Sequence, residues 1–213
     1  RETLSLLGIE DEQLVVPEAN DITVEKYVLP SFKRGSLPNY EFAQTTRRWL
    51  RDRFKASVTK ESSVESPERI YVSRQNLDNR YVSNFDQLTG ILDEYDFTII
   101  EPETHSIEDQ IQLFRNAKLI VGPYGSGLYN MMFSTDATVV TFIAEDFVSE
   151  KKSAFCYAAI EFGHDYALYE GNVSRNEGAG ELNGDAKSKP FSIPPEQFES
   201  VLRKSVDNNQ QAE

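Results

Sequence analysis

A glycine-rich turn is the segment of this sequence best suited to hold a ligand. It runs Leu119-Ile-Val-Gly-Pro-Tyr-Gly-Ser-Gly-Leu-Tyr-Asn130, with three glycines within six residues between an apolar run and a helix start. Glycine lets a backbone approach a ligand closely and adopt positive φ. A helix start offers unpaired N–H groups at the positive end of its dipole. The turn therefore suits a nucleotide diphosphate, although a tight strand-to-helix connection without a ligand would use the same residues.

Two common phosphate-binding motifs do not describe this turn. A Walker loop needs a Gly-Lys-Ser/Thr ending, which is absent here. The dinucleotide fingerprint has another glycine spacing and opens a βαβ unit, whereas this turn stands late in the chain. No such glycine loop follows the expected strands around Val15 and Tyr71 either, so an oxidoreductase that binds NAD or a flavin is the weakest of three candidate functions.

Two arginines favour the ligand-binding interpretation. Ser73 and Arg74 follow the apolar run that ends at Val72, and Arg80 comes six residues later. In a parallel sheet, the end of that strand lies on the same side as the Gly122 turn. A guanidinium there can clamp phosphate oxygens in bidentate geometry. The alternative is a surface arginine paired with one of the 35 acidic residues of the chain.

Alternating apolar runs and amphipathic segments predict an α/β fold. Strands are expected at 13–17, 24–29, 69–73, 97–100, 119–121, 138–143 and 166–169, and helices at 38–54, 84–95, 106–117, 125–133, 149–162 and from Pro195 onward. This rhythm indicates βαβ units and a Rossmann-like, doubly wound, mostly parallel sheet, with ligands at the carboxyl ends of its strands.

Composition excludes several kinds of partner. The chain has 213 residues and a net charge of −13, which repels a nucleic-acid backbone unless a local basic patch compensates. The basic residues at 47–55 recur at helical spacing beside Trp49, as on the solvated face of an amphipathic helix. No apolar run approaches the ~18 residues of a membrane span. With one cysteine and two histidines, neither a disulfide nor a zinc site is expected.

An ordered series of motifs resembles glycosyltransferase family 61. The series is Ile70-Tyr-Val-Ser-Arg74, Arg80-x-x-x-Asn84, Pro102-Glu103, Gln110-Ile-x-Leu-Phe114, Ala117 and Gly122-Pro-Tyr-Gly-Ser-Gly-Leu-x-Asn130-x-x-Phe133. The match is strongest from about Arg69 to Ile143 and weaker toward both ends. The family includes bacterial capsular-polysaccharide transferases, plant xylosyltransferases and arabinosyltransferases, and animal N-acetylglucosaminyltransferases that act on proteins.

The resemblance implies the nucleotide-sugar-binding half of a GT-B enzyme, which performs inverting transfer without a metal or other cofactor. A UDP-sugar is the expected donor, and a glycan or protein hydroxyl the acceptor. The implied donor and phosphate contacts are Ser73, Arg74, Arg80, Gly122, Tyr124, Gly125, Ser126, Gly127 and Leu128. Asn84, Glu103, Gln110 and Asn130 are implied to be supporting or sugar-contacting residues, and Glu103 could instead bind a ribose. Gln110 could equally serve helix packing, which is the favoured interpretation for Phe114.

The sequence departs from the family pattern at two positions. Tyr124 stands where the family usually has histidine; tyrosine can donate a hydrogen bond or stack, but it cannot carry a proton near neutral pH. Asn84 is followed by Phe85, where an acid is common. The acceptor-side domain with the general base is expected before Arg1, as a missing N-terminal partner domain of the same protein. A non-catalytic nucleotide-binding module, or degenerate transferase, therefore remains the main alternative.

The expected organisation has four parts. Residues 1–60 are a remnant of, or linker from, the acceptor-side domain, and 61–170 form the Rossmann-like donor-binding domain. Residues 171–190, rich in Gly, Asn and Ser, are expected to be a mobile loop, and 191–213 a C-terminal helix and tail. The chain itself carries no anchor, so we expect cytoplasmic location in a bacterium and the secretory lumen in a eukaryote.

Overall fold

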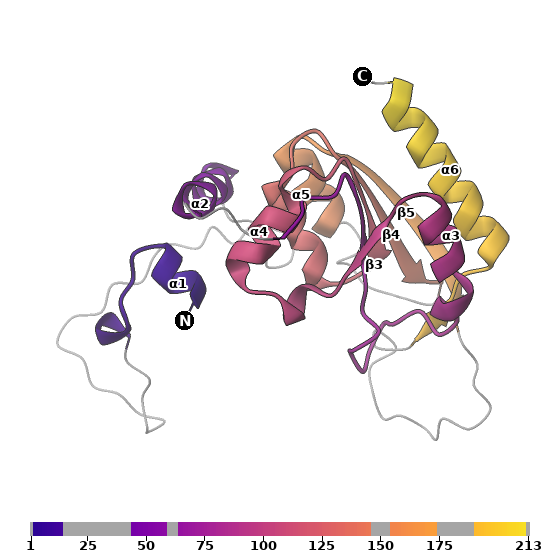
Figure 1. The fold of residues 1–213 in the computed structure, drawn as a ribbon, viewed down its shortest axis with the longest axis horizontal. Helices are drawn as coiled ribbons and strands as arrows, with labels where there is room; N and C mark the ends of the chain where they lie inside the picture. Colours follow the sequence, from indigo (N-terminus) through magenta and orange to yellow (C-terminus); the bar gives the residue numbers. More distant parts are fainter. Residues whose placement is uncertain (1, 15–43, 59–63, 146–153, 174–189, 212–213) are drawn as a thin grey trace. The chain divides into compact units, whose positions relative to one another are not determined.

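The computed structural model describes residues 2–14, 44–58, 64–145, 154–173 and 190–211 (Figure 1). The chain divides into two compact units, residues 1–60 and residues 61–213. The expected strand at 24–29, most of the one at 13–17 and most of the loop at 171–190 lie outside the described residues. No described helix is both long enough and apolar enough to cross a membrane.

Among the described residues of the first unit, two α-helices are joined by a serine hydrogen bond. Helix α1 (Glu2–Leu6) is followed by Gly8, whose φ of 78° favours glycine. Helix α2 (Gln44–Ser57) ends in Ser57, whose hydroxyl donates to the Leu6 carbonyl oxygen at 2.8 Å. The prediction of a strand that begins at Gln13 is wrong at that residue. The 3-10 turn η1 (Asp11–Gln13) forms there instead, and the Gln13 side chain accepts a hydrogen bond from the Glu10 amide at 2.8 Å.

The second unit is built on a six-stranded sheet in the order β2-β1-β3-β4-β5-β6. Its strands are β1 (Arg69–Val72), β2 (Thr98–Ile100), β3 (Leu119–Pro123), β4 (Thr138–Ala144), β5 (Asp165–Val173) and β6 (Phe191–Ser192). The first five are parallel, and β6 pairs antiparallel with β5. The prediction of an α/β fold with a mostly parallel sheet is therefore confirmed.

Strand β5 is longer than the sequence indicated, and β6 was not predicted. The first three residues of the expected loop, 171–173, belong to β5. Glycine is required at position 171 for β6 to lie beside β5, because a Cβ atom there would meet Phe191 Cδ2 at 2.7 Å and the Ser192 carbonyl oxygen at 2.8 Å. The glycine that indicated a loop is instead the residue that allows β6 to pack closely against β5.

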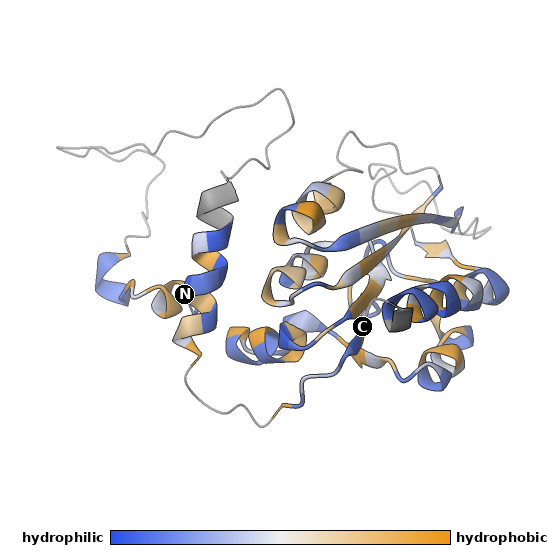
Figure 2. Cartoon of the chain, turned by 90° about the horizontal axis from the view of Figure 1, so that it is seen from above, coloured by the Kyte–Doolittle hydropathy of each residue, from blue (hydrophilic) through white to orange (hydrophobic). Residues whose placement is uncertain are grey.

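Helices cover both faces of the sheet: Figure 1 shows α3 (Thr89–Glu94) and α6 (Pro195–Gln211) on one side of it and α4 (Ile107–Arg115) and α5 (Ala154–Phe162) on the other. Three 3-10 helices complete the unit: η2 (Phe85–Gln87), η3 (Pro102–Thr104) and η4 (Ser126–Phe133). Figure 2 shows the hydrophobic residues gathered on the strands and on the helix faces turned toward them. The expected helices at 84–95 and 125–133 form wholly or partly as 3-10 turns.

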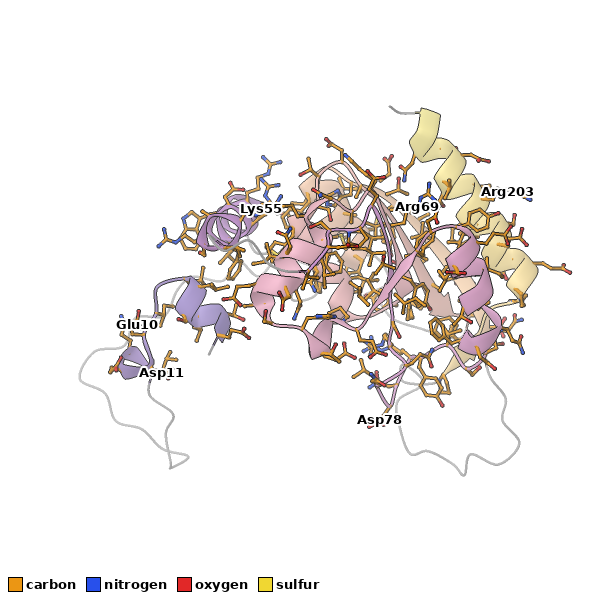
Figure 3. The ribbon with its side chains drawn as sticks, viewed as in Figure 1. Glu10, Asp11, Lys55, Arg69, Asp78 and Arg203 are labelled. Carbon is orange, nitrogen blue, oxygen red and sulfur yellow. The ribbon has the colours of Figure 1, made fainter. Side chains whose placement is uncertain are left out.

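Local hydrogen bonds explain where several elements begin and end. The Ser106 hydroxyl caps α4 by accepting the Asp109 amide at 3.1 Å. Arg69, at the start of β1, donates to the Tyr95 carbonyl oxygen at the end of α3 at 2.7 Å (Figure 3). A cation in that position complements the negative end of the helix dipole.

The order of the strands reverses between β1 and β3. The chain passes from β1 outward to β2, and then returns across β1 to β3 and onward to β4 and β5. Ligands of open parallel sheets bind in the crevice at such a switch point, outside the carboxyl ends of the strands. The register pairs Tyr71 with Val121, so Ser73 and the glycine-rich turn leave the sheet at the same edge.

His164 is part of the core rather than of a reactive site. Its ring is 4% exposed, Nδ1 accepts the Ala137 amide at 3.1 Å, and Nε2 donates to the Met131 carbonyl oxygen at 2.9 Å. Because Nδ1 accepts, the ring carries its proton on Nε2. These two backbone partners lie more than twenty residues away in the chain.

A pair of glycine substitutions tests the packing of β1 against β3. A Cβ atom on Gly122 would lie 2.6 Å from the Val72 carbonyl oxygen, whereas one on Gly90 in α3 would meet nothing within 4 Å. We expect Gly122→Ala to lower the free energy of unfolding by about 1–3 kcal/mol, and Gly90→Ala to raise it by about 0.5–1 kcal/mol. Chemical denaturation measures both, and a Gly122→Ala variant as stable as the parent would contradict the contact.

Candidate functional site

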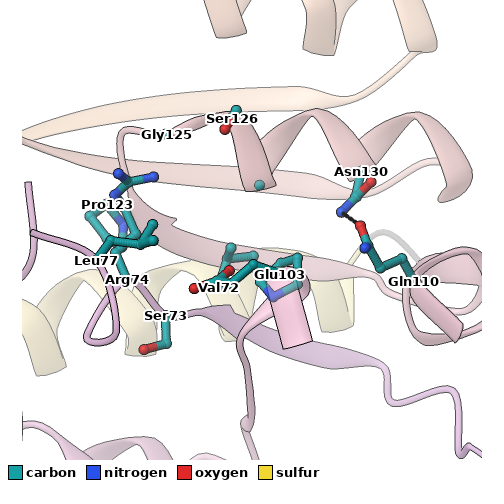
Figure 4. A pocket seen from close by; sticks show the side chains of 12 residues that line it. Val72, Ser73, Arg74, Leu77, Glu103, Gln110, Pro123, Gly125, Ser126 and Asn130 are labelled. Carbon is teal, nitrogen blue, oxygen red and sulfur yellow. Dashed lines mark hydrogen bonds between the residues drawn. The ribbon is translucent and has the colours of Figure 1, made fainter. Parts of the chain in front are cut away.

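A pocket of about 340 Å³ lies at the carboxyl ends of β1 and β3 (Figure 4). Eight of the residues singled out in the sequence line it: Ser73, Arg74, Glu103, Gln110, Gly125, Ser126, Gly127 and Asn130. Four further lining residues, Val72, Leu77, Pro102 and Pro123, were not predicted. They are apolar residues beside polar ones, and nothing in their local sequence distinguishes them from core residues.

Ser73 is fixed at the point where β1 leaves the sheet. Its amide donates to the Ile100 carbonyl oxygen at 2.7 Å, which extends the pairing with β2 by one residue. Its hydroxyl accepts the Gln75 amide at 3.2 Å and donates to Glu101 Oε1 at 3.5 Å. These bonds turn the chain sharply after the strand, so that Arg74 is directed toward the glycine-rich turn.

The Arg74 guanidinium lies against the backbone of Gly125 and is only 7% exposed. Nε and Nη2 donate to the Asn79 carbonyl oxygen at 3.4 and 3.3 Å, and Nη2 also donates to Asn79 Oδ1 at 2.7 Å. A Cβ atom on Gly125 would lie within 3.0 Å of Arg74 Cδ and Cζ, and closer still to Nη1. Within the described residues, Nη1 donates no hydrogen bond.

The charge of Arg74 is only weakly compensated. Its pKa is lowered from the usual value to about 10, first by burial and then by the positive charge of Arg80, while the Glu103 carboxylate acts in the opposite direction. The group therefore stays protonated at neutral pH. Because a buried cation is costly without a counter-charge, a bound anion would relieve both the desolvation and the repulsion from Arg80.

Each glycine of the turn leaves room for neighbouring protein atoms. Gly122 and Gly125 meet Val72 and Arg74 as described above, and Gly127 lies where a Cβ atom would be 3.1 Å from Val72 Cγ1 and 3.3 Å from Pro102 Cγ. None of these three glycines has a positive φ; among the described glycines only Gly8 and Gly163 do. Close packing is therefore the reason for glycine at these positions.

The first residues of η4, Ser126 and Gly127, line the pocket. Leu128 is the first residue of this helix whose amide bonds back, to the Gly125 carbonyl oxygen at 3.0 Å. No side chain caps this end, so the amides of Ser126 and Gly127 have no partner among the described residues. Such amides, beside a buried guanidinium, can hold phosphate oxygens.

The opposite end of the pocket is formed by two amide side chains. Asn130 Nδ2 donates to Gln110 Oε1 at 2.9 Å, and Gln110 Nε2 donates to the His105 carbonyl oxygen at 3.0 Å. Figure 4 shows this pair away from Arg74, with Glu103 between the two ends. The preference for Phe114 as a packing residue is confirmed, since its side chain is fully buried.

Tyr124 lies outside the pocket lining. Its ring packs edge-to-face on Phe155 of α5, with ring centroids 4.5 Å apart, and is 6% exposed. Successive side chains of extended backbone point to opposite sides, so Pro123 lines the pocket while Tyr124 does not. Gly122 and Leu128 are likewise buried away from the pocket.

Arg80 and Asn84 lie on the loop that follows Arg74 but do not line the pocket. Arg80 has a φ of 55° and affects the site through its charge on Arg74. Asn84 Nδ2 donates to the Ile193 carbonyl oxygen at 2.8 Å, and its Oδ1 accepts the Ile193 amide at 3.0 Å. This side chain therefore joins the loop to the segment between β6 and α6.

Replacing Asn84 distinguishes a structural role from ligand contact. We expect Asn84→Ala to lower the free energy of unfolding by about 1–3 kcal/mol, because two buried backbone groups of Ile193 lose their partner. Nucleotide affinity should change by less than about threefold if the side chain does not touch the ligand. Thermal denaturation and calorimetric titration measure the two effects. Unchanged stability with a large loss of affinity would instead place Asn84 against the ligand.

Comparison with known proteins agrees with the motifs. A family model described as Glycosyltransferase 61 matches residues 2–141, about two thirds of the chain. The match includes β1, β2, β3 and the turn that carries Gly125, and it ends within β4. No curated protein matches the chain. By this match, the chain belongs to the glycosyltransferase 61 family.

Proposed function

We propose that the chain supplies the donor-binding site of an inverting glycosyltransferase of GT-B architecture. The observation that carries this proposal is the buried, weakly compensated guanidinium of Arg74 close to the start of η4, whose first two amides have no partner among the described residues, at the switch point of the sheet. Membership of the family supports a sugar donor and an acceptor. A nucleotide sugar, with UDP as the nucleotide, fits a pocket that has a cationic end and a polar amide end.

In the proposed complex, the diphosphate lies between Arg74 Nη1 and the amides of Ser126 and Gly127. These donors directly follow two neighbouring strands, β1 and β3, and Gly125 packs on the arginine between them. The sugar or ribose hydroxyls then lie toward Glu103, Gln110 and Asn130. A carboxylate and two amides are hydrogen-bonding groups suited to hydroxyls, whereas phosphate favours the other end.

The proposed reaction is a single displacement at the anomeric carbon. An acceptor hydroxyl attacks this carbon, the bond to the diphosphate oxygen breaks, and the nucleoside diphosphate leaves with the negative charge. Arg74 and the η4 amides stabilise that charge as it develops, an effect worth a few kcal/mol for each well-placed donor. The general base that takes the hydroxyl proton belongs, in this proposal, to the acceptor-side domain. The acceptor is a glycan or protein hydroxyl.

A non-catalytic nucleotide-binding module is the second candidate. The observation that favours it is Tyr124, which stands at the position of the usual family histidine and packs on Phe155 outside the pocket. No histidine lines the described pocket. Such a module would bind the nucleotide through Arg74 but transfer no sugar. A transfer assay on the protein together with its acceptor-side domain separates this candidate from the first.

Titration with nucleotides tests the donor site. We expect one of UDP, GDP and CDP to bind saturably, and Arg74→Ala to weaken that binding at least about tenfold, because a charge-assisted phosphate contact is lost. Isothermal calorimetry measures the affinities, with NAD as a fourth ligand. Arg203→Ala, which removes an exposed arginine of α6 (Figure 3), is the matched control and should bind like the parent.

The other outcomes are equally informative. Binding of NAD alone would point to an oxidoreductase and contradict the proposed site. Equal affinities for the parent and Arg74→Ala would show that the diphosphate lies elsewhere, even if a nucleotide binds.

A further inference from the structure

The hydrogen-bond partner of the buried Arg74 side chain is a neutral amide. Three hydrogen bonds join its Nε and Nη2 to Asn79, two to the backbone carbonyl and one to the side chain. Buried arginines are ordinarily balanced by a carboxylate, because an uncompensated buried charge is costly. Within the described part of the chain, Arg74 forms no ion pair.

The loop between these residues brings Asn79 back onto Arg74. The Leu77 amide donates to the Arg74 carbonyl oxygen at 3.1 Å, and Gln75 Nε2 donates to the Val82 carbonyl oxygen at 2.9 Å. This folded loop occupies one edge of the guanidinium and leaves Nη1 on the side of Gly125 and the pocket. Asn79 thus determines which donors of Arg74 remain for a ligand.

The acidic groups around Arg74 are directed to other partners or to solvent. Glu101 accepts hydrogen bonds from Ser73 Oγ and from Asn76 Nδ2. Glu103 is exposed at the pocket edge, and Asp78, next to Asn79 in sequence, is exposed at the outer side of the loop (Figure 3). A carboxylate is therefore available one residue away, but the fold places the neutral side chain on the arginine.

We propose that Asn79 is a positioning residue of the donor site, which fixes the Nη1 edge of Arg74 toward the pocket and leaves the positive charge available to an anionic ligand. This inference rests on the proposed function. Aspartate has nearly the same shape as asparagine and would keep the hydrogen bonds to Nη2. It would also neutralise the guanidinium before any ligand arrives, so the site would lose affinity for phosphate while the fold gained an ion pair.

A charge exchange within the loop separates these effects. The double variant Asp78→Asn with Asn79→Asp keeps the composition and net charge of the chain and moves one carboxylate onto Arg74. We expect its melting temperature to equal or exceed that of the parent. Its affinity for UDP and for inorganic pyrophosphate should fall by about tenfold or more. Calorimetric titration of the full chain measures both ligands.

Two further variants complete the test. Asp78→Asn alone should bind both ligands as the parent does, because Asp78 is exposed and does not contact Arg74. Asn79→Ala, which keeps only the backbone carbonyl, should lose affinity and stability together. Raising the salt concentration should weaken binding to the parent more steeply than to the double variant, because the charge that salt screens is already neutralised there.

The result that overturns the inference is a double variant that binds pyrophosphate and UDP as tightly as the parent. Binding of UDP by the parent would in that case leave the proposed donor site standing. A parent that binds neither ligand would overturn both proposals. A double variant that melts well below the parent would contradict the expected ion pair between Arg74 and an aspartate at position 79. The salt dependence of ligand binding by Asn79→Asp alone would then decide whether the free charge of Arg74 contributes to binding.

Discussion

The site depends on one contact, in which the guanidinium of Arg74 lies directly on the backbone of Gly125. Arg74 follows β1 and Gly125 follows β3, and the arginine can be buried there only because Gly125 has no side chain. The same requirement holds at Gly122 and Gly127, which leave room for Val72 on β1. The three glycines thus bring the ends of β1 and β3 close enough for Arg74 to lie against the turn that leads into η4.

This close packing places a charged group where water cannot fully solvate it. Burial and the nearby Arg80 lower the pKa of Arg74 to about 10, and its hydrogen-bond partner Asn79 carries no charge. For folding alone, a carboxylate in place of Asn79, or an apolar residue in place of Arg74, would be more favourable. A site that must hold a diphosphate gains from a cation that is already oriented and desolvated, since little reorganisation is then needed on binding.

The part of the chain beyond the family match completes the same unit. Strands β5 and β6 and helix α6 lie entirely after Thr141, where the match ends. Phe191 and Ile193 from this region bond to the backbone of the loop at 81–83 and to Asn84. The loop that carries Asn79 and Arg80 is therefore held at its far end by the C-terminal segment, about 110 residues later in the sequence.

The sequence by itself determined the alternation of strands and helices, the parallel sheet, and the meeting of Arg74 with the glycine-rich turn. These features follow from apolar periodicity and from the rule that parallel strands end at one edge. Only the tertiary structure decided that Tyr124 packs on Phe155, that Asn84 binds Ile193, and that Gly171 continues a strand. Each of these depends on a partner distant in the chain, and a local pattern carries no information about the atoms that folding brings beside it.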